Sequence, residues 1–407
     1  MLQNEIAVAL YNFIKKGVPD KSGRESFNGI FGESFVAHRK PIMSANFNYD
    51  MNTRAVTITQ VNSATVSRVL NLMTLKSGTN AAGSTTLQTK ENLRYQAGRD
   101  AELMFTALYD PGVANNRRIF GIFDANDGIF LGYVNTVFGI GIRKGTVDTF
   151  ISQTSWNKDK CDGFGSSGFT LDKTKLNIYR INYGYLGVAP VILQVYGGNV
   201  IGWITCHAYD ISNASTGTHI NSPYLPIRAE NTNTGNTVDV KMQSGSVYCG
   251  TIDGSGATDS SSREFTRKIS VAGITAGTDK PLIIFHNKTT YGTVTNKIQD
   301  LLLKVGIGVD GTKTVEISLY KLAAVPTGTT FTDVDLANSN MEISTSGTIS
   351  LTDAELLNAW ELGKTDSLSE DTTRFNLLLN PNEYAVFTFT STGSSDVGLV
   401  ARWSELF

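Results

Sequence analysis

Histidines and cysteines are the side chains best suited to nucleophilic or metal chemistry, and their spacing here argues against both. The histidines are His38, His207, His219 and His286, and none has a partner at a metal-ligand spacing such as His-x-x-x-His. His207 directly follows Cys206 in an apparent strand, where successive side chains point to opposite faces of a sheet. A catalytic Cys-His pair must converge in space, so we do not expect these two residues to form one.

The cysteines are Cys161, Cys206 and Cys249, an odd number at wide spacing. That pattern indicates neither a disulfide framework nor a metal site. We therefore expect three small buried thiols, which would suit assembly in a reducing compartment. No P-loop, nucleophile elbow or dinucleotide fingerprint occurs, so no catalytic residue, metal or cofactor is predicted.

Carboxylate side chains could bind a hard cation or cleave a glycoside. Two groups offer oxygen ligands to a hard cation: Asp124 with Asn126 and Asp127, and Asp159 with Asp162. A calcium loop closes with Glu at its twelfth position, which from Asp124 is Asn135. Asn126-Asp127-Gly128 instead lies between two alternating apolar runs, which predicts a β-hairpin turn. A glycosidase carboxylate pair cannot be located by sequence alone, so a polysaccharide depolymerase stays an open alternative.

Exposed aromatic rings on a neutral surface would suit stacking against sugars. The tryptophans are Trp156, Trp203, Trp360 and Trp403, and they are spread along the chain. Aromatic side chains also dominate cores and interfaces, and we favour that interpretation. Sugar binding remains the alternative.

The composition favours strands and turns as the elements that hold these residues. Charged residues make up 18% of the 407 residues, against about 25% in an average domain, and Gly, Thr, Ser and Asn take their place. A net charge of −2 gives no global field for nucleic acid or an anionic membrane. The amino-terminal residues do not follow the order of a signal peptide, and no apolar run approaches the ~20 residues of a membrane span.

The pattern along the chain predicts an all-β protein with two β-sandwich, jelly-roll-like domains. We expect residues 1–90 to form an amino-terminal helix and extended attachment arm, 91–250 a first β-sandwich, and 266–407 a second. A Gly/Ser-rich stretch at 77–84 suggests a boundary before the first domain, and residues 251–265 suggest a linker.

Two short helices are predicted. Residues 1–16 carry an apolar stripe that would pack on the body or grip another subunit, composed of Leu2, Ile6, Leu10, Phe13 and Ile14. In the carboxy-terminal domain Thr352 and Glu355 match a capping box, and Gly363 would end that helix.

Several short segments in order resemble a family of virion structural proteins of tailed bacteriophages and some large DNA viruses. These are Phe27-Asn28-Gly29, Glu33-Ser34, Tyr95-Gln96-Ala97-Gly98, Trp156-Asn157-Lys158-Asp159-Lys160, Asp162-Gly163, Ser167-Gly168, Leu171-Asp172, Tyr185-Leu186-Gly187-Val188 and Ser222-Pro223-Tyr224-Leu225-Pro226-Ile227-Arg228-Ala229-Glu230. The resemblance covers about half the chain and implies a capsid-, spike- or fibre-associated role, with no catalytic residue to carry over. Locally, Arg228 and Glu230 should project on one side as a charge pair.

We therefore expect a non-enzymatic structural component of a virus particle, assembled in the host cytoplasm. Its expected partners are itself as a homo-oligomer and other virion proteins of the capsid, portal or tail. The alternative is a receptor- or glycan-binding module of a spike or fibre, with a host surface glycan as its ligand.

Overall fold

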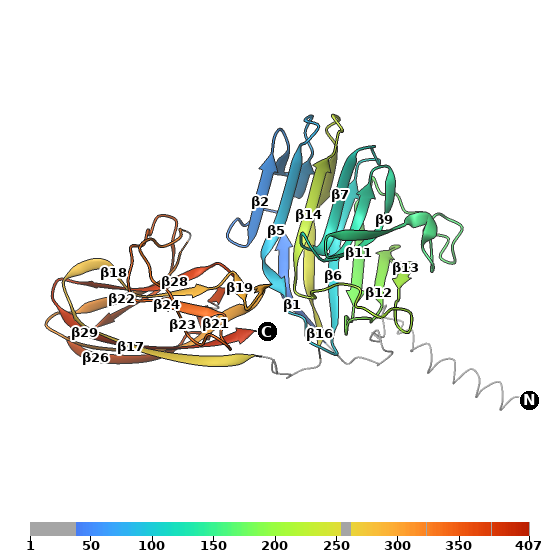
Figure 1. Ribbon diagram of the computed structural model, residues 1–407. Helices are drawn as coiled ribbons and strands as arrows, with labels where there is room; N and C mark the ends of the chain where they lie inside the picture. The colour runs from blue at the N-terminus through green and yellow to red at the C-terminus, as the bar shows by residue number, and fades with distance from the viewer. Residues whose placement is uncertain (1–37, 254–261, 323, 376, 407) are drawn as a thin grey trace, which may run out of the picture. The chain divides into compact units, whose positions relative to one another are not determined.

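The computed structural model describes residues 38–253, 262–322, 324–375 and 377–406. These residues are built from strands, and helical structure among them is limited to the 3₁₀ turns η1 (Gln153–Ser155) and η2 (Thr373–Phe375). None of the helices in this described part is long and apolar enough to span a membrane. The chain divides between residues 257 and 258 into a first and a second compact unit (Figure 1).

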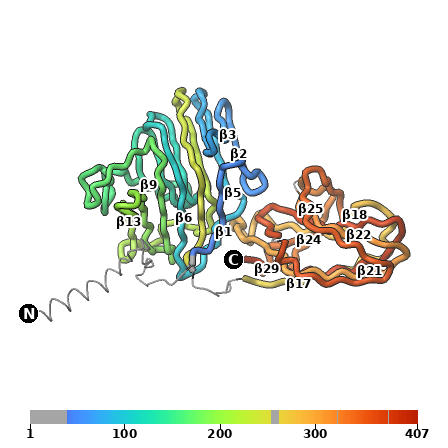
Figure 2. Tube along the Cα trace, turned by 180° about the vertical axis from the view of Figure 1, so that it is seen from behind, coloured from blue at the N-terminus to red at the C-terminus, as the bar shows by residue number. Residues whose placement is uncertain are grey.

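The first unit is a sandwich of two antiparallel sheets. Within the described residues sheet I has nine strands: β13 (Trp203–Tyr209), β12 (Val191–Tyr196), β11 (Asn177–Tyr183), β6 (Asp100–Tyr109), β15 (Lys241–Ser244), β4 (Leu72–Lys76) and β3 (Thr65–Val69) in that order, with β16 (Ser246–Asp253) between β6 and β1 (His38–Asn46). Seen from behind, β13 lies at one side of this unit and β2 and β3 at the other (Figure 2).

Sheet II covers the inner face of sheet I. Its described strands are β10 (Val147–Ser152), β9 (Val137–Lys144), β8 (Gly128–Val134), β7 (Asn116–Phe123), β14 (Leu225–Asn233), β5 (Ser84–Leu93) and β2 (Val56–Val61). Antiparallel hairpins connect β7 to β8 and β8 to β9. The turn between β7 and β8 is the hairpin that Asn126-Asp127-Gly128 predicts.

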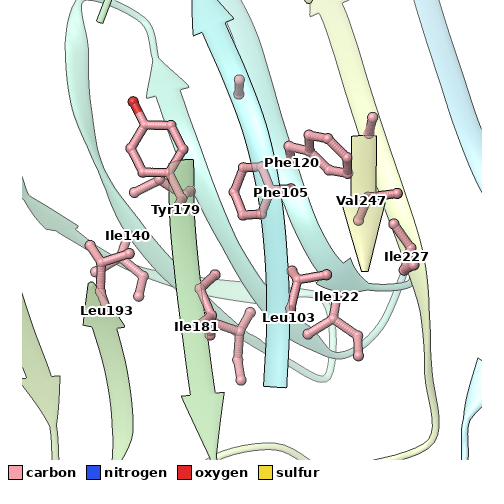
Figure 3. Close-up of a cluster of buried hydrophobic side chains, with 14 of the residues drawn as sticks. Leu103, Phe105, Phe120, Ile122, Ile140, Tyr179, Ile181, Leu193, Ile227 and Val247 are labelled. Atoms are coloured by element: carbon pink, nitrogen blue, oxygen red, sulfur yellow. The ribbon is translucent and has the colours of Figure 1, made fainter. Parts of the chain in front are cut away.

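The period of two in β6 explains how the sheets meet. Leu103, Phe105 and Ala107 are buried on one face, while Met104 and Thr106 alternate with them on the other. Phe105 lies 4.6 Å, centroid to centroid, from Phe120 of sheet II. Figure 3 shows these rings within the apolar layer between the two sheets. Burial of such a layer is the main favourable term in folding.

The second unit is a smaller two-sheet sandwich. Sheet III contains β17 (Arg263–Ile274), β29 (Ser395–Leu406), β21 (Gln299–Gly311) and β26 (Thr365–Asp371), with β27 (Leu378–Leu379) paired to β21. Sheet IV contains β23 (Thr332–Asp333), β24 (Met341–Ser344), β18 (Gly277–Asn287), β28 (Tyr384–Ser391), β22 (Val315–Leu322) and β25 (Glu355–Leu362). A separate two-stranded ribbon is formed by β19 (Thr290–Tyr291) and β20 (Val294–Thr295). Phe285 of sheet IV packs edge-on against Trp403 of sheet III, 5.7 Å between centroids.

The structure confirms the all-β class and the packed sheets, whereas the jelly-roll winding stays a prediction. The helix expected after Thr352 is wrong, because residues Glu355–Leu362 form β25. Pairing with β22 places Trp360 opposite Ile317, where it stacks on Phe387 at 6.2 Å. Asp353, with a φ of 59°, also leaves the helical region. Tertiary burial of Trp360 therefore outweighs the local capping signal.

The arm expected over residues 1–90 also needs correction. Residues 38–90 contribute β1 to β4 and most of β5, and β5 is an interior strand of sheet II. The Gly/Ser-rich stretch at 77–84 connects β4 to β5 inside the first unit, so it is not a domain boundary. The predicted amino-terminal helix, with Leu2, Ile6, Leu10, Phe13 and Ile14, lies outside the described residues.

Candidate functional site

The outer face of sheet I, which points away from the core of the first unit, brings together polar and aromatic side chains. Directly paired residues of an antiparallel sheet share a face, so the strand register places them in rows. One row crosses five strands in the order Ser246, Thr106, Ile178, Tyr196 and Trp203. In it Thr106 is paired with Ile178 and Tyr196 with Trp203, and the registers of the adjoining strands, continued by one position, add the other two neighbours. We call this the aromatic row.

A second row runs beside the first. It contains Tyr248, Met104, Arg180, Gln194 and Thr205, on the same strands in the same order. We call it the polar row. The period of two along each strand places the two rows on one face, so that face alternates between apolar and hydrogen-bonding side chains.

A hollow of about 440 Å³ opens at one end of the aromatic row. It is lined by Ser44, Ala45, Asn46, Met104, Phe105, Thr106, Ile178, Ser246, Val247 and Tyr248. Ile178 is 39% exposed, and it lies on the same sheet face as Tyr196 because Arg180 and Gln194, two positions away on the same strands, are paired. The hollow and the two aromatic rings therefore belong to one continuous surface.

A break between β15 and β16 shapes this hollow. Gly245 separates the two strands, and its amide donates a 2.8 Å hydrogen bond to Thr106 Oγ1. The amide of Ser246 donates to the same oxygen at 3.1 Å. Past this break the chain pairs with β1 instead of β4, so β1 becomes one wall of the hollow.

The cationic side chain of Arg180 packs against the Trp203 ring. The Arg180 guanidinium lies 4.1 Å from the centre of the Trp203 ring, and Tyr196 meets that ring edge-on at 5.4 Å. Arg180 Nε donates to Gln194 Oε1 at 2.6 Å, and Gln194 Nε2 donates to Thr205 Oγ1 at 3.1 Å. These contacts fix the orientation of the ring.

Glu102 is the acidic partner of Arg180 and of Arg39. Its side chain is fully buried, with Arg39 Nε at 2.6 Å from Oε1 and Arg180 Nη1 at 3.7 Å from Oε2. A buried carboxylate needs such partners, because desolvation of an isolated charge is costly. Burial, with a smaller contribution from the Glu102 charge, raises the pKa of Tyr248 to about 12. Tyr248 therefore stays a neutral hydroxyl at the edge of the hollow.

The sequence candidates for metal or nucleophilic chemistry do not assemble into such a site. Asp124 Oδ1 accepts the amides of Asn126 and Asp127 at 2.7 and 2.8 Å, which is the turn chemistry predicted. Asp159 likewise accepts the amides of Cys161 and Ser167. Burial alone would raise the pKa of Asp159, but the hydrogen bonds that its carboxylate accepts together outweigh burial, so the pKa is lowered. Among the described residues, no group of three or more His, Cys, Asp or Glu side chains is placed to hold a metal ion.

Most of the other residues singled out in the sequence are buried. All three cysteines are buried, as expected, and so are His207, His219 and His286. Trp156, Trp360 and Trp403 are core residues, 3%, 7% and 2% exposed, while Trp203 lies on the outer face of sheet I. Arg228 and Glu230 form the predicted charge pair, with Arg228 Nε donating to Glu230 Oε1 at 2.7 Å.

Sequence analysis missed Arg180, Glu102, Gln194 and the hollow. Each of these polar residues stands between two buried residues of its strand, and this alternation was the available signal. The cross-strand register that unites them depends on tertiary pairing, which the sequence does not specify locally.

Comparison with known proteins gives no family assignment. No protein-family model matches the sequence, and no curated protein is significantly similar to it. Among solved structures, the cellulose induced protein Cip1 is 14% identical, with a TM-score of 0.34 over 51% of this chain and 96% of that chain.

Two further solved structures are similar at the same level. One belongs to work on endo-acting O-glycanases by which human gut microbiota initiate mucin breakdown; it is 14% identical, with a TM-score of 0.38 over 53% of this chain and 100% of that chain. The other is the binding domain of botulinum neurotoxin serotype D/C, 13% identical, with a TM-score of 0.34 over 52% and 48% of the respective chains. Similarity this low supports no conclusion about function.

Proposed function

We propose that the first unit is a carbohydrate-binding module that holds a glycan along the aromatic row without cleaving it. The observation that carries this proposal is the continuity of the hollow, Ile178, Tyr196 and Trp203 on one sheet face. Sugar rings offer apolar C–H faces that pack on aromatic rings, and an amphipathic aromatic surface suits such a ligand.

The neighbouring polar row supplies hydrogen-bonding groups for the sugar hydroxyls. Gln194 and Thr205 carry neutral hydrogen-bonding groups, and Arg180 and Glu102 form a charged pair beside them. Hydroxyl groups that leave water must find new hydrogen bonds, so a ligand that fits both rows gains specificity. A purely apolar ligand would leave the polar row unpaired.

A role without catalysis is part of the proposal. Hydrolysis of a glycoside needs two carboxyl groups about 5 to 10 Å apart across the scissile bond. Glu102 and Asp100 lie on this face and are both buried, and the Glu102 carboxylate is held against Arg39 and Arg180. That arrangement fits a positioning role for Glu102.

A glycan array probed with the full chain tests the proposal. We expect a subset of glycans to bind, and Trp203→Ala to weaken that binding by roughly tenfold or more, as for a buried aromatic anchor. Phe164→Ala is the matched control, because Phe164 is 95% exposed on the loop that follows η1. Equal losses in both variants, or no glycan bound, would contradict the proposal. Shortening of the bound glycan, detected by mass spectrometry, would contradict its non-catalytic part.

We also propose that this module works on a virus particle as a homo-oligomer. The support is the sequence resemblance to phage virion proteins, together with the low charge content of the chain. Light scattering on the purified full chain tests the assembly. A protein that stays monomeric at high concentration and does not join purified particles would argue against this setting.

A further inference from the structure

Two of the three cysteines, 45 positions apart in sequence, meet in the folded first unit. Cys161 Sγ lies 3.4 Å from Cys206 Sγ, and both side chains are buried. Cys161 belongs to the long loop between η1 and β11, whereas Cys206 lies in β13 at the edge of sheet I. Nothing in their sequence spacing indicates this contact.

The backbone around both sulfurs is tied down. The carbonyl of Cys206 accepts the amides of Lys158 and Asp159, each at 3.1 Å. The amide of Cys161 donates to Asp159 Oδ1 at 2.8 Å, and its carbonyl accepts the amide of Leu171 at 2.9 Å. The loop is thus fixed to β13 at the point where the thiols meet.

Asp159 determines the course of the loop. Besides Cys161, its carboxylate accepts the amide of Ser167 at 2.8 Å and the hydroxyl of Ser166 at 3.3 Å. A Cβ on Gly165 would lie 2.1 Å from Asp159 Oδ1, so this close approach requires glycine. Cys161 itself has a φ of 49°, an uncommon conformation for a residue with a side chain. The surrounding hydrogen bonds hold it there.

We propose that Cys161 and Cys206 are a disulfide-forming pair that staples the η1–β11 loop to β13 under oxidising conditions. The sulfurs must approach by about 1.4 Å to reach the S–S bond length of about 2.05 Å. In the reaction the Cys161 or Cys206 thiolate attacks an external low-molecular-weight disulfide and releases one thiol. The second thiolate then displaces the other thiol from the mixed disulfide. Both cysteines are oxidised, and the external disulfide is reduced to two thiols.

Folding is the stage at which this bond forms. The hydrogen bond to Cys161 and burial both raise the pKa of the Cys206 thiol, so the reactive thiolate is scarce in the folded unit. The same burial protects the bond from reductants once it exists. Because β13 also carries Trp203, the staple fixes the edge strand that ends the aromatic row.

Refolding of the full chain in a buffer of oxidised and reduced glutathione tests the pair. After alkylation of remaining thiols and proteolysis, mass spectrometry should find a peptide linked through Cys161 and Cys206, with Cys249 alkylated. Alkylation of both Cys161 and Cys206, glutathione adducts alone, or a link to Cys249 would each overturn the proposal.

A stability measurement provides the second readout. The oxidised chain should unfold at a temperature roughly 5–10 °C above that of the reduced chain, since the bond closes a long loop. The Cys161→Ser/Cys206→Ser double variant should lose this difference, and Cys249→Ser, buried on β16, should keep it. An unchanged difference in the double variant would contradict the assignment, and the glycan result does not bear on it.

Discussion

The Arg180 guanidinium lies against the Trp203 ring at 4.1 Å while it also faces the buried Glu102 carboxylate. One cation therefore supports an aromatic surface and balances an internal charge. Cation–π contacts of this kind are strongest where water is excluded, and Arg180 is only 4% exposed. The geometry of the proposed ligand face and the stability of sheet I consequently depend on the same side chain.

Replacement of Arg180 tests this dual role. Arg180→Met should lower the free energy of unfolding by about 1–3 kcal/mol, because Glu102 keeps Arg39 but loses its buried partner. Glycan affinity should fall as well, since Trp203 loses its support. Urea unfolding and the glycan array supply the two measurements. Arg374→Met is the control, because this arginine is 65% exposed in its pair with Glu370, and surface pairs contribute less than about 1 kcal/mol.

A buried pair of acids in the second unit should make its stability depend on pH. Asp300 and Glu405 are directly paired across β21 and β29. Burial, and then the charge of Glu405, raise the pKa of Asp300 well above its usual range, and burial raises the pKa of Glu405. A carboxyl group with a raised pKa in the folded state stabilises the fold below its unfolded pKa, near 4. That stability is lost as the pH rises through the folded pKa.

We therefore expect the second unit to be more stable at mildly acidic than at neutral pH. Calorimetry on the full chain should show one unfolding transition whose midpoint falls by roughly 3–8 °C between about pH 5 and pH 7.5. Asp300→Asn should raise that midpoint at neutral pH and reduce its pH dependence. A transition that is instead more stable at neutral pH, in wild type and variant alike, would rule out this effect of the acid pair.

A glycine in sheet II leaves room for an aromatic ring. A Cβ on Gly141 would lie 2.1 Å from the Phe130 ring, on the face where Arg143 also covers Phe130 at 5.6 Å. Gly141→Ala should therefore destabilise the first unit by about 1–3 kcal/mol through overpacking. Gly308→Ala in β21 is the matched control, since a Cβ there meets nothing within 4 Å. Urea unfolding measures the loss in free energy of unfolding for each variant. Equal losses would show that contact with the Phe130 ring does not determine the effect of the substitution.

Local patterns in the sequence predict much of the fold. The alternation of Leu103, Phe105 and Ala107 predicts a half-buried strand, and Asn126-Asp127-Gly128 predicts the turn between β7 and β8. The prediction fails after Thr352, where capping residues indicate a helix although Trp360 is buried by a neighbouring strand. Local signals decide an element only where tertiary contacts agree with them.

The candidate site is less accessible to sequence reasoning for the same reason. Trp203 was one of four tryptophans that the sequence could not separate into core and surface. Its partner Arg180 is 23 residues away, and Glu102 is farther still; Cys161 and Cys206 come together through the path of a loop. These contacts depend on strand register and loop closure, which are non-local properties.

The pairing of β1 with β16 has a mechanical consequence. His38 at the start of β1 lies opposite Asp253 at the end of β16, so the described chain enters and leaves the first unit at one end of a single strand pair. A pull between these two ends would load the hydrogen bonds of that pair one after another, in the manner of a zipper. β1 provides Ser44 and Asn46 to the hollow, and these residues lie at the far end of the pair, so tension on the chain would reach that wall only after the pairs next to His38 have opened.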